Sequence, residues 1–470
     1  MHFHLIGICG TAMASLAGML NARGHRVTGS DSNVYPPMST QLEALGIKSI
    51  DGYKKENAHS GADVFVVGNA ISRGNAELEE VLARKLNYRS LAEVVKEEFL
   101  RGRRTLVVAG THGKTTTTSV AAWVSETGGL NPSFLVGGIV QNFGASFRVS
   151  ESEYFVIEGD EYDTAFFDKK PKFMHYLPEI AIVGNIEFDH ADIYDDVEQI
   201  KREMFRLMNL VPSNGKVIVG IDSKYAREVL EKNRKKLFTN VETFGLSSDA
   251  KWNAREIVFD EDETRFAVFR ENARWKTFRT KLIGEFNVRN CLSVIIAADA
   301  WGISPERIQE AFDTFKSVKR RVEIRGVEDG VTIIDDFAHH PTAVEETLKA
   351  LGQKYRDRRI IAVFEPRSWS SRLAVFQAAY ARAFEYADHT VIAGVYNTSA
   401  ASEMGKVLDV NELVAGINAG GRSAVSLPDV DAIVEHLTPE MHDGDIVAVM
   451  SNGGFGGIHD KLLEVLKNRS

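Results

Sequence analysis

One segment of the chain, AGTHGKTTTT at residues 109–118, limits the possible folds more than any other. It lies directly between an apolar run, TLVVAG at 105–110, and a helix-like stretch. A glycine-rich turn between a buried strand and a helix directs backbone N–H groups and the positive end of the helix dipole toward a phosphate. The segment therefore predicts a parallel α/β domain with a nucleoside triphosphate site at this turn.

The residue types in this turn suit phosphate chemistry. The Lys114 ammonium would lie at the β- and γ-phosphates, and the Thr115 hydroxyl can bind Mg²⁺. The usual phosphate-loop pattern has a glycine five residues before the Gly-Lys pair, whereas this chain has Val108. The alternative is a glycine turn with an incidental lysine, and the flanking strand and helix argue against it. The residues predicted to bind ATP at this turn are Gly110, Thr111, His112, Gly113, Lys114, Thr115 and Thr116.

Two acidic segments, VIEGDEYD at 156–163 and GNIEFDHADIYDD at 184–196, follow strands in the same region. Ligands bind at the carboxyl ends of parallel strands, and carboxylates are good ligands for Mg²⁺. The segments therefore predict a metal site, with solvated acidic loops as the alternative and, for the histidine, a hydrogen-bonded structural role. The side chains in question are Glu158, Asp160, Glu161, Asp189 and His190.

A second strand–turn–helix unit opens the chain, with the turn at Gly7-Ile8-Cys9-Gly10-Thr11-Ala12. The G-x-G-x-x-G dinucleotide fingerprint would need glycine where the chain has Cys9 and Ala12. The N–H groups of the turn can still hold a pyrophosphate, and Asp31, about 20 residues further on, can accept hydrogen bonds from a ribose. The residues alone leave three possibilities: a redox dinucleotide, another nucleotide diphosphate, or a scaffold without a ligand.

The alternation of strands and helices continues through three regions, which predict domains at 1–104, 105–316 and 317–470. The middle domain is expected to combine a parallel sheet with a small antiparallel one, and the third to be parallel α/β again. Helices are predicted at 11–23, 76–86 and 287–302. Strand-like runs lie at 2–8, 26–31, 62–70, 105–110, 153–159, 180–186, 215–221, 266–270, 275–284, 330–341, 359–368, 389–395 and 445–457.

Composition excludes several classes of protein. The net charge of −9 makes the chain a poor candidate for binding nucleic acid or a membrane surface. No run of 18 apolar residues predicts a membrane span, and the apolar start lacks the basic residues and cleavage region of a signal peptide. Two cysteines, Cys9 and Cys291, cannot form a disulfide framework and fit a reducing compartment. We therefore expect a cytoplasmic protein with no nucleic-acid partner and no membrane insertion.

Five segments in series resemble the Mur ligases of peptidoglycan synthesis: the N-terminal glycine turn, G-T-H-G-K-T-T, E-G-D-E, N-I-E-F-D-H and D-D-F-A-H-H-P-T. The resemblance spans nearly the whole chain. It implies a Rossmann-like domain that binds a UDP-sugar, a central ATPase domain, and a C-terminal Rossmann-like domain that closes on both. A redox role for the first turn becomes unfavourable. The residues expected to bind the UDP-sugar are Gly7, Cys9, Gly10, Thr11, Ala12, Asp31, Asn69 and Ala70.

Within this family the sequence is most similar to the branch that acts on UDP-N-acetylmuramate. The stretches 30–40, 160–176 and 450–462 favour the activity that adds L-Ala-γ-D-Glu-meso-diaminopimelate during wall recycling over the one that adds L-alanine. The L-alanine enzyme has a shorter D-E-S-D-A-S-F where this chain has DTAFFDKKPKFMHY. Other hypotheses are a nicotinamide oxidoreductase and a non-catalytic sensor of UDP-sugar and ATP.

The resemblance also implies a mechanism. ATP would phosphorylate the lactyl carboxylate to an acyl phosphate, which the amine of the tripeptide then attacks. Thr115 and Glu158 would bind a first Mg²⁺ and His190 a second, and we expect no carbamylated lysine. The residues expected to act in catalysis are Lys114, Glu158, His190, Arg321 and His339.

Further ATP and peptide contacts follow from the same resemblance. The family's adenine-binding H-N-x-x-N matches Asn287 and Asn290, although Phe286 replaces its histidine. Without the resemblance, this pair would be interpreted as a helix cap and a surface residue. Additional ATP contacts are expected from Arg321 and Asp336. Diaminopimelate presents an extra carboxylate, for which an arginine clamp is expected, and the alternative is that the candidates are surface or turn residues. The candidates are Arg367, Arg372 and Asn452.

Overall fold

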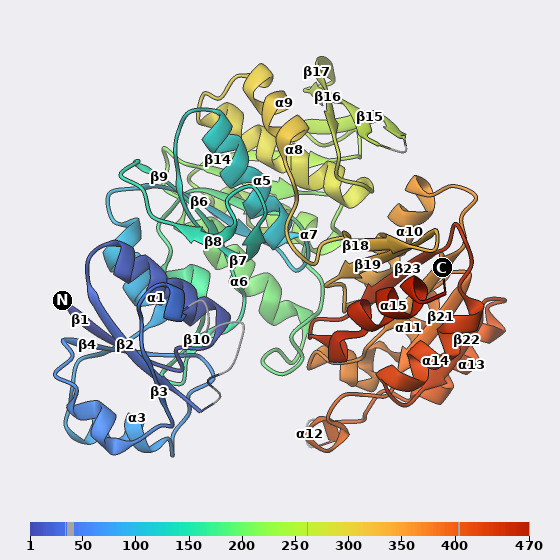
Figure 1. Ribbon diagram of the computed structural model, residues 1–470. Coiled ribbons are helices and arrows are strands. Elements are labelled where there is room, and N and C mark those ends of the chain that lie inside the picture. The colour runs from blue at the N-terminus through green and yellow to red at the C-terminus, as the bar shows by residue number, and fades with distance from the viewer. Residues whose placement is uncertain (33, 35–41, 261, 403–404, 470) are drawn as a thin grey trace. The chain divides into compact units, whose positions relative to one another are not determined.

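The computed structural model describes residues 1–32, 34, 42–260, 262–402 and 405–469, and the chain forms two compact units (Figure 1). The first unit comprises Met1–Glu187, Glu198–Asn253 and Cys291–Lys316, and the second comprises Phe188–Val197, Ala254–Asn290 and Ser317–Ser470. Residues 33 and 35–40, most of the distinguishing stretch 30–40, lie outside the described residues. In the part of the chain that the structure describes, no helix has both the length and the apolar character needed to cross a membrane.

The first unit begins with a five-stranded sheet in the order β3-β2-β1-β4-β5, in which all neighbouring pairs are parallel. Strands β1 and β4 are buried along their whole length, as is typical of parallel strands that helices cover. Helix α3 packs on the face that presents Ile6, Phe65 and Val67. The elements are β1 (His2–Ile6), α1 (Thr11–Ala22), β2 (Arg26–Asp31), β3 (Ser49–Asp51), η1 (Lys55–His59), β4 (Val64–Val67), α3 (Ala76–Ala83), β5 (Tyr88–Ser90), α4 (Leu91–Val95) and η2 (Lys96–Leu100).

The strands of a larger sheet run in the order β17-β16-β15-β14-β13-β12-β6-β9-β7-β8, and those from β14 to β8 form the centre of the first unit. Only the last pair, β7 with β8, is antiparallel among the neighbours from β14 to β8. Because β6 and β9 are parallel neighbours, the turns that follow them meet at one edge of the sheet. The elements are β6 (Arg104–Ala109), α5 (Lys114–Thr127), β7 (Ser133–Val140), β8 (Ala145–Arg148), β9 (Tyr154–Glu158), β10 (Asp163–Ala165), β11 (Asp168–Pro171), η3 (Lys172–His175), β12 (Pro178–Val183), α6 (Val197–Leu210), β13 (Lys216–Gly220), α7 (Lys224–Asn233), η4 (Arg234–Lys236), β14 (Asn240–Gly245), β15 (Trp252–Phe259) and α9 (Pro305–Thr314).

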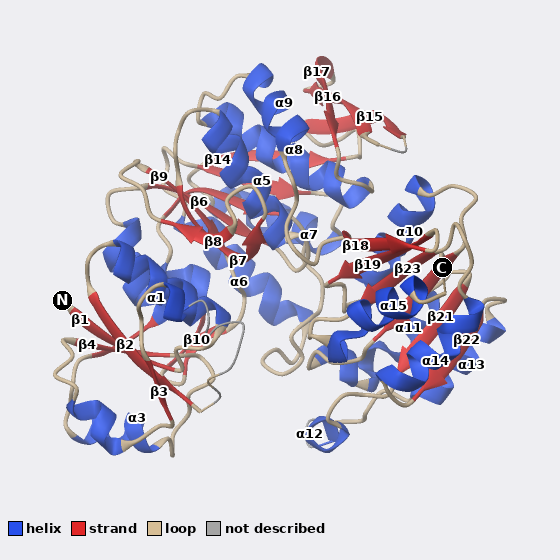
Figure 2. Cartoon of the chain, viewed as in Figure 1, coloured by secondary structure: helices blue, strands red, loops and turns tan. Residues whose placement is uncertain are grey.

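The second unit contains a six-stranded sheet in the order β18-β19-β23-β20-β21-β22, parallel except for the edge strand β18. Alternate residues of β20 enter two separate cores: Ile360, Ala362 and Phe364 pack with α10, α11 and α13, whereas Ile361 and Val363 pack with α14 and α15 (Figure 2). This period of two places helices on both faces of the sheet. The elements, with α8 crossing from one unit into the other along the chain, are β16 (Thr264–Arg270), β17 (Ala273–Thr280), α8 (Glu285–Ala300), β18 (Glu323–Glu328), β19 (Val331–Asp336), α10 (Pro341–Lys354), β20 (Ile360–Phe364), η5 (Ser370–Arg372), η6 (Ala374–Phe376), α11 (Gln377–Ala383), β21 (His389–Ala393), α12 (Thr398–Ser402), α13 (Val410–Ala419), β22 (Ser423–Leu427), α14 (Val430–Glu440), β23 (Ile446–Met450), η7 (Phe455–Gly457) and α15 (Ile458–Lys467).

The parallel α/β architecture expected from the sequence is confirmed, and the antiparallel pair expected near 266–284 is β16 with β17. Several predicted strands run too far, because each prediction includes the turn that follows the strand. Among them are 2–8, 62–70, 275–284, 330–341, 359–368 and 445–457, which end at Ile6, Val67, Thr280, Asp336, Phe364 and Met450. Strands β7, β8, β14, β18 and β22 have no predicted counterpart, since most of them are partly exposed and carry no clear apolar pattern.

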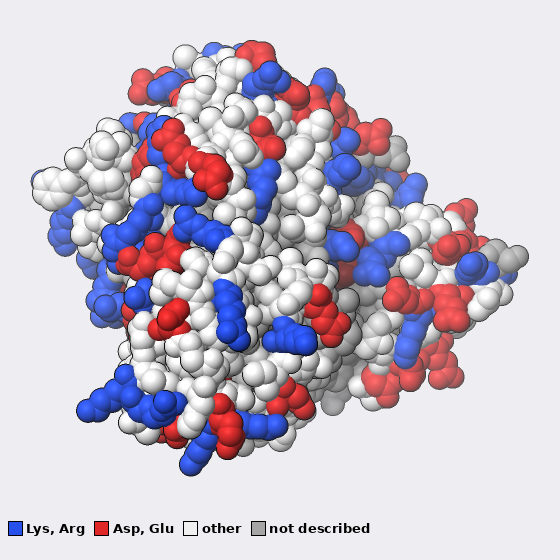
Figure 3. Space-filling view, turned by 60° about the vertical axis from the view of Figure 1, so that its left-hand side comes forward, with Lys and Arg blue, Asp and Glu red and all other residues white. Residues whose placement is uncertain are grey.

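On the face that Figure 3 shows, Lys and Arg side chains lie interspersed with Asp and Glu. With a net charge of −9, the positive charge that an anionic nucleotide needs must come from individual residues at its site.

Candidate functional site

The phosphate loop lies at the carboxyl end of β6, where Gly110 and Gly113 adopt positive φ angles of 136° and 79°. Residues that carry a side chain rarely adopt these backbone conformations, so glycine is needed at both positions. Helix α5 begins directly at Lys114 and has no side-chain cap, which leaves the N–H groups of its first turn for an anion. The Lys114 ammonium donates to the carbonyl oxygens of Gly110 (2.7 Å) and Thr111 (3.1 Å), so the side chain lies over the loop.

Lys114 also pairs with a buried carboxylate from the neighbouring strand end. Its ammonium lies 2.7 Å from Glu161 Oε2, and the side chain of Glu161 is only 2% exposed. Burial raises the pKa of Glu161 to about 7, the Lys114 charge opposes that rise, and the adjacent Asp160 carboxylate adds to it. Burial alone would lower the pKa of Lys114, but the carboxylates of Glu161, Asp160 and Glu158 outweigh it, so the pKa of Lys114 is raised. The lysine is therefore charged at neutral pH.

The predicted metal ligands Thr115 and Glu158 meet in the structure. The Thr115 hydroxyl donates to Glu158 Oε1 at 2.9 Å, while Glu158 Oε2 accepts the N–H of Gly137 at 2.8 Å. A side chain on Gly137 would lie 3.0 Å from that carboxylate, so the glycine keeps room for it. A hydroxyl and a carboxylate at this distance form the hard oxygen pair that Mg²⁺ prefers, so the residues present fit this ion.

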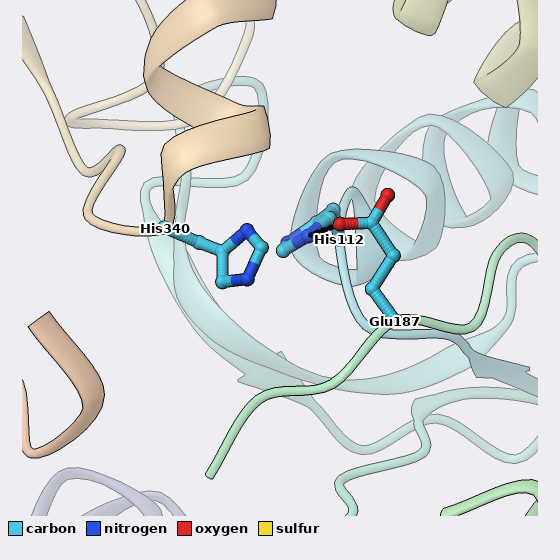
Figure 4. Close-up of side chains that lie close together, drawn as sticks. All are labelled: His112, Glu187 and His340. Atoms are coloured by element: carbon cyan, nitrogen blue, oxygen red, sulfur yellow. Dashed lines mark hydrogen bonds and ion pairs between the residues drawn. The ribbon is translucent and has the colours of Figure 1, made fainter. Parts of the chain in front are cut away.

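The loop is braced by the segment that follows β12. Asn185 accepts the N–H of His112 at 2.8 Å and donates to the His112 carbonyl at 3.0 Å, and its own carbonyl accepts the N–H of Thr111 at 3.1 Å. The His112 ring nitrogen Nε2 lies 3.3 Å from Glu187 Oε2, and Figure 4 shows these two side chains next to each other. These contacts give the N-I-E segment a supporting role at the phosphate loop that the sequence analysis did not predict. Its only signal was that Asn185 lies inside a recognised motif.

The first glycine turn is held by the neighbouring strand β2. The N–H groups of Gly7 (2.8 Å) and Ile8 (3.1 Å) donate to the Ser30 carbonyl, and the N–H of Cys9 donates to Asp31 Oδ2 at 2.9 Å. The second oxygen of Asp31 accepts the Tyr53 hydroxyl at 3.2 Å. Burial and the Asp31 charge together raise the pKa of the Tyr53 hydroxyl to about 12 and also raise the pKa of the Cys9 thiol.

These hydrogen bonds reduce the number of N–H groups that remain to bind an anion at the first turn. Several of the N–H groups predicted to hold a pyrophosphate, including those of Gly7 and Cys9, are used within the protein. Helix α1 begins at Thr11 and, like α5, has no side-chain cap, so the N–H groups of Thr11 and Ala12 have no acceptor within the helix. The start of α1 is therefore the part of this turn best suited to a phosphate. Asn69 and Ala70 lie in the turn after β4.

A buried polar network behind this turn has no counterpart in the sequence analysis. The Glu77 carboxylate, which is fully buried, accepts the Ser30 hydroxyl (2.7 Å) and the Asn57 amide (2.8 Å), and it lies 2.8 Å from His4 Nε2. Because the carbonyl of the same Ser30 holds the turn, Glu77 supports the turn indirectly. The sequence gives no signal that Glu77 is buried, because it is one of three glutamates in the same short helix.

The adenine-site candidates lie in the second unit, at the start of α8. Asn287 is buried, its amide donates to the Ile283 carbonyl at 2.9 Å, and its Oδ1 accepts the Asn290 amide at 3.0 Å. Neither residue caps the helix, because α8 begins at Glu285. The Phe286 ring, in place of the family histidine, packs close to the backbone of Gly284, where an added side chain would lie 2.7 Å from the ring.

The remaining catalytic candidates also belong to the second unit. His190 has a positive φ of 54°, and its N–H donates to the buried Asp189 carboxylate at 2.7 Å. Arg321 lies over the Phe337 ring at 5.0 Å. Burial raises the pKa of Asp336, and the Arg321 charge opposes part of that rise. The ring of His339 meets Phe337 edge-on at 5.6 Å. Arg321, Asp336 and His339 thus gather around the end of β19.

The peptide-site candidates differ in exposure. Arg372 is buried, donates to main-chain carbonyls of Ser368, Tyr396 and Asn397, and stacks over the Trp369 ring at 4.0 Å. The Arg367 side chain is 30% exposed, and its guanidinium lies 3.4 Å from Glu365 and stacks on the Tyr396 ring at 4.0 Å. The Asn452 side-chain oxygen is buried without a hydrogen-bond partner among the described residues. The more exposed Arg367 is the better placed of the two arginines to contact a ligand.

The structure thus brings the predicted residues together in groups within each unit. In the first unit these are the phosphate loop with Lys114, Thr115 and Glu158, and the turn at 7–12 with Asp31. The second unit carries the rest: His190, Asn287, Asn290, Arg321, Asp336, His339, Arg367, Arg372 and Asn452.

Three family models match the chain in series. They are described as Mur ligase family, catalytic domain (residues 2–102), Mur ligase middle domain (108–298), and Mur ligase, glutamate ligase domain (320–453). The chain therefore contains three Mur ligase domains in series, while the predicted boundaries near residues 104 and 316 stay predictions.

Individual relatives match along their full length. The UDP-N-acetylmuramate–L-alanyl-γ-D-glutamyl-meso-2,6-diaminoheptandioate ligase of Haemophilus influenzae is 40% identical over 468 residues, 99% of each chain. The UDP-N-acetylmuramate–L-alanine ligase of Acetivibrio thermocellus is 33% identical over 468 residues, 98% of this chain and 96% of that one. The crystal structure of a murein peptide ligase from Psychrobacter arcticus matches with a TM-score of 0.73 and 36% identity, covering 100% of this chain and 99% of that chain.

Proposed function

The chain belongs to the Mur ligase family of ATP-dependent, ADP-forming ligases, and we propose that it joins L-Ala-γ-D-Glu-meso-diaminopimelate to the lactyl carboxylate of UDP-N-acetylmuramate. The proposal rests on two helices of the first unit, α5 and α1, which both begin without a side-chain cap. The start of α5 carries the charged Lys114 and the Thr115–Glu158 pair, whereas the start of α1 carries no such groups among the described residues. The first suits a triphosphate with Mg²⁺, and the second suits the diphosphate of a UDP-sugar. Diaminopimelate is the diaminoheptandioate in the name of the Haemophilus relative.

The reaction needs ATP because a carboxylate has no good leaving group. A lactyl carboxylate oxygen attacks the γ-phosphorus, a new O–P bond forms, and the bond to the β-phosphate oxygen breaks to release ADP. The tripeptide amine then attacks the carbonyl carbon of the acyl phosphate, the C–N bond forms, and inorganic phosphate leaves with the bonding electron pair. The amine loses its proton in this step, and His339 is our candidate to accept it.

Lys114 contributes charge in the first step. Its ammonium lies over the loop that faces the phosphates, so it neutralises charge on the transferred phosphoryl group. Thr115 and Glu158 would hold Mg²⁺, which supplies charge neutralisation between nucleotide and carboxylate when bound. Glu161 keeps the lysine over the loop.

For the second unit we retain the roles that family membership implies. Asn287 and Asn290 would bind adenine, Arg321 and Asp336 would contact the nucleotide, and His190 would bind a second Mg²⁺. For binding the tripeptide, Arg367 is the better candidate of the two arginines, because Arg372 is buried and already donates to main-chain carbonyls. ATP and UDP-sugars are cytoplasmic metabolites, so the proposed reaction belongs to the cytoplasm.

The proposal is tested by choice of amine. The protein is incubated with ATP, Mg²⁺ and UDP-N-acetylmuramate, with either the tripeptide or L-alanine, and phosphate release and product mass are measured. We expect rapid ligation with the tripeptide and slow or no ligation with L-alanine. Preference for L-alanine would show a biosynthetic L-alanine ligase instead, the activity named for the Acetivibrio relative. Binding of both nucleotides without phosphate release would show a non-catalytic sensor.

A further inference from the structure

One segment of the first unit has no role in the site as described so far. It consists of β10, β11 and the short helix η3, and we call residues 163–175 the hairpin. It leaves the sheet only a few residues after Glu158, the last residue of β9, and it falls within the stretch that distinguishes this chain from the L-alanine ligases. An insertion at this position either lies on the surface without a role in the site or contacts residues that support the site.

The hairpin holds its own shape. Asp163 pairs with Pro171 and Ala165 with Asp168 in an antiparallel ladder, and the Thr164 hydroxyl donates to the Lys170 carbonyl at 2.8 Å. His175 Nε2 lies 2.6 Å from the Asp168 carboxylate. These contacts make the segment a compact element rather than a loose loop.

At its tip the hairpin reaches the N-terminal sheet. Phe166 and Phe167 pack against the core formed by Ile6, Phe65, Val67 and Ile71 and their neighbours. The rings of Phe167 and Tyr88 meet edge-on at 5.1 Å, a favourable aromatic geometry.

The same core supports the first glycine turn. A side-chain carbon added at Gly7 would lie 3.4 Å from Ile71, so the turn rests on the residue that this core contains. Displacement of the hairpin tip would therefore be felt at the turn through one layer of packed side chains.

At its base the hairpin forms an ion pair with the acidic loop at residues 159–162, which follows β9 at the phosphate site. The Lys172 ammonium lies 2.6 Å from Asp160 Oδ2, and Lys172 is only 9% exposed although it carries a charge. The next residue, Glu161, is the partner of Lys114. A buried ammonium costs free energy unless it is paired with an opposite charge. Here Lys172 neutralises Asp160, which is adjacent to Glu161 in the chain.

We propose that the hairpin is a positioning element that aligns the first glycine turn with the phosphate loop, acting through Phe167 at its tip and Lys172 at its base. The inference rests on the proposed function, because phosphoryl transfer to the sugar carboxylate needs groups bound at the two turns to meet within a fraction of an ångström. A misplacement of about 1 Å can cost about 100-fold in rate without loss of binding. Neither residue touches the reacting atoms in this account.

The test compares Phe167→Ala and Lys172→Met with the matched control Lys170→Met, an exposed lysine on the same hairpin. We expect kcat for ligation to fall by about 10- to 100-fold in the first two variants, with the dissociation constants for UDP-N-acetylmuramate and for ATP changed less than about threefold. Lys172→Arg retains the ion pair and should recover most of kcat. The control should match the wild type in all three quantities.

Hydrogen exchange measured on the same proteins gives a readout that does not depend on activity. In Phe167→Ala we expect faster amide exchange both at Gly7 and Ile8 and in the acidic loop 159–162, and no change in Lys170→Met. Exchange that rises only around residue 167, or a kcat equal to wild type, overturns the proposal. If Phe167→Ala does not fold, Phe167→Leu and Lys172→Met decide it. A wild type that ligates neither amine refutes the proposed function, while the exchange data still decide whether the hairpin couples the two turns.

Discussion

The two glycine turns of the first unit look alike in sequence but are held in different ways. Both follow a buried parallel strand, and both lead into a helix with no side-chain cap. In the turn at 7–12, the neighbouring strand supplies a carbonyl and a carboxylate that accept backbone N–H groups. In the loop at 110–113, the neighbouring strand end supplies a carboxylate to a lysine, and a third segment braces the backbone.

This difference separates binding from chemistry. The first turn is fixed by hydrogen bonds from β2 and is suited to hold a diphosphate that does not react. The second carries a buried charge pair with a raised carboxyl pKa, which can respond when a phosphoryl group is transferred. A turn that only binds needs rigid geometry, whereas a turn that catalyses also needs charge placed where charge develops.

The largest effect is expected from Lys114→Met. Loss of the ammonium should reduce ligation by about 1,000-fold or more, because its charge is needed in the transition state, while binding of UDP-N-acetylmuramate stays within about threefold. Turnover assays and calorimetry measure the two quantities. Since the change also leaves Glu161 unpaired, the double variant Lys114→Met/Glu161→Gln serves as the folding control. Retained ligase activity in either variant would remove the distinction between the turns.

The next effect is a pH dependence of stability carried by Glu161. Its pKa is raised to about 7 from 4.5, so between these values the folded protein binds more protons than the unfolded one. Stability from this group is therefore fully present below pH 4.5 and is lost as the pH rises to about 7, by up to about 3 kcal/mol. Denaturant unfolding of wild type and Glu161→Gln at pH 5 to 8 measures it. A free-energy difference between the two that does not change over this range contradicts the assignment.

A smaller and more selective effect is expected from Asp31→Ala. The variant removes the acceptor for the Cys9 N–H and the Tyr53 hydroxyl, so the first turn loosens while the phosphate loop keeps its contacts. We expect the loosened turn to bind UDP-N-acetylmuramate roughly 10- to 30-fold more weakly, a loss of about 1.4 to 2 kcal/mol in binding free energy. The KM for ATP should be unchanged. Equal loss for both nucleotides would mean that Asp31 supports the whole unit and not the first turn.

The smallest effect is expected from Ser30→Ala, which leaves the carbonyl that holds the turn and removes only the hydroxyl that donates to Glu77. The carboxylate keeps Asn57 and His4 as partners, so we expect about 1 kcal/mol lower stability and at most a threefold rise in KM for the UDP-sugar. Thermal unfolding and steady-state kinetics measure these values. A larger kinetic change would show that the network controls the turn directly.

Much of this site could be read from local sequence. The strand–glycine–helix pattern predicted the phosphate loop, and the pairing of Thr115 with Glu158 follows once β6 and β9 are parallel neighbours. The partner of Lys114 was harder to predict, because Asp160 and Glu161 are adjacent and only the buried one faces the lysine. Glu77 and Lys172 gave no signal at all, since charged residues in a helix or hairpin are ordinarily exposed.

The sequence by itself determined the parallel α/β class, the two turns and the family, because backbone preferences and apolar periodicity act over a few residues. Only the tertiary structure decided which N–H groups of the first turn remain for an anion, and which of two neighbouring acids holds the lysine. It also showed that the hairpin at 163–175 contacts both the N-terminal core and the acidic loop. Those facts depend on contacts between residues far apart in the chain, and packing selects such contacts from many that the sequence alone allows.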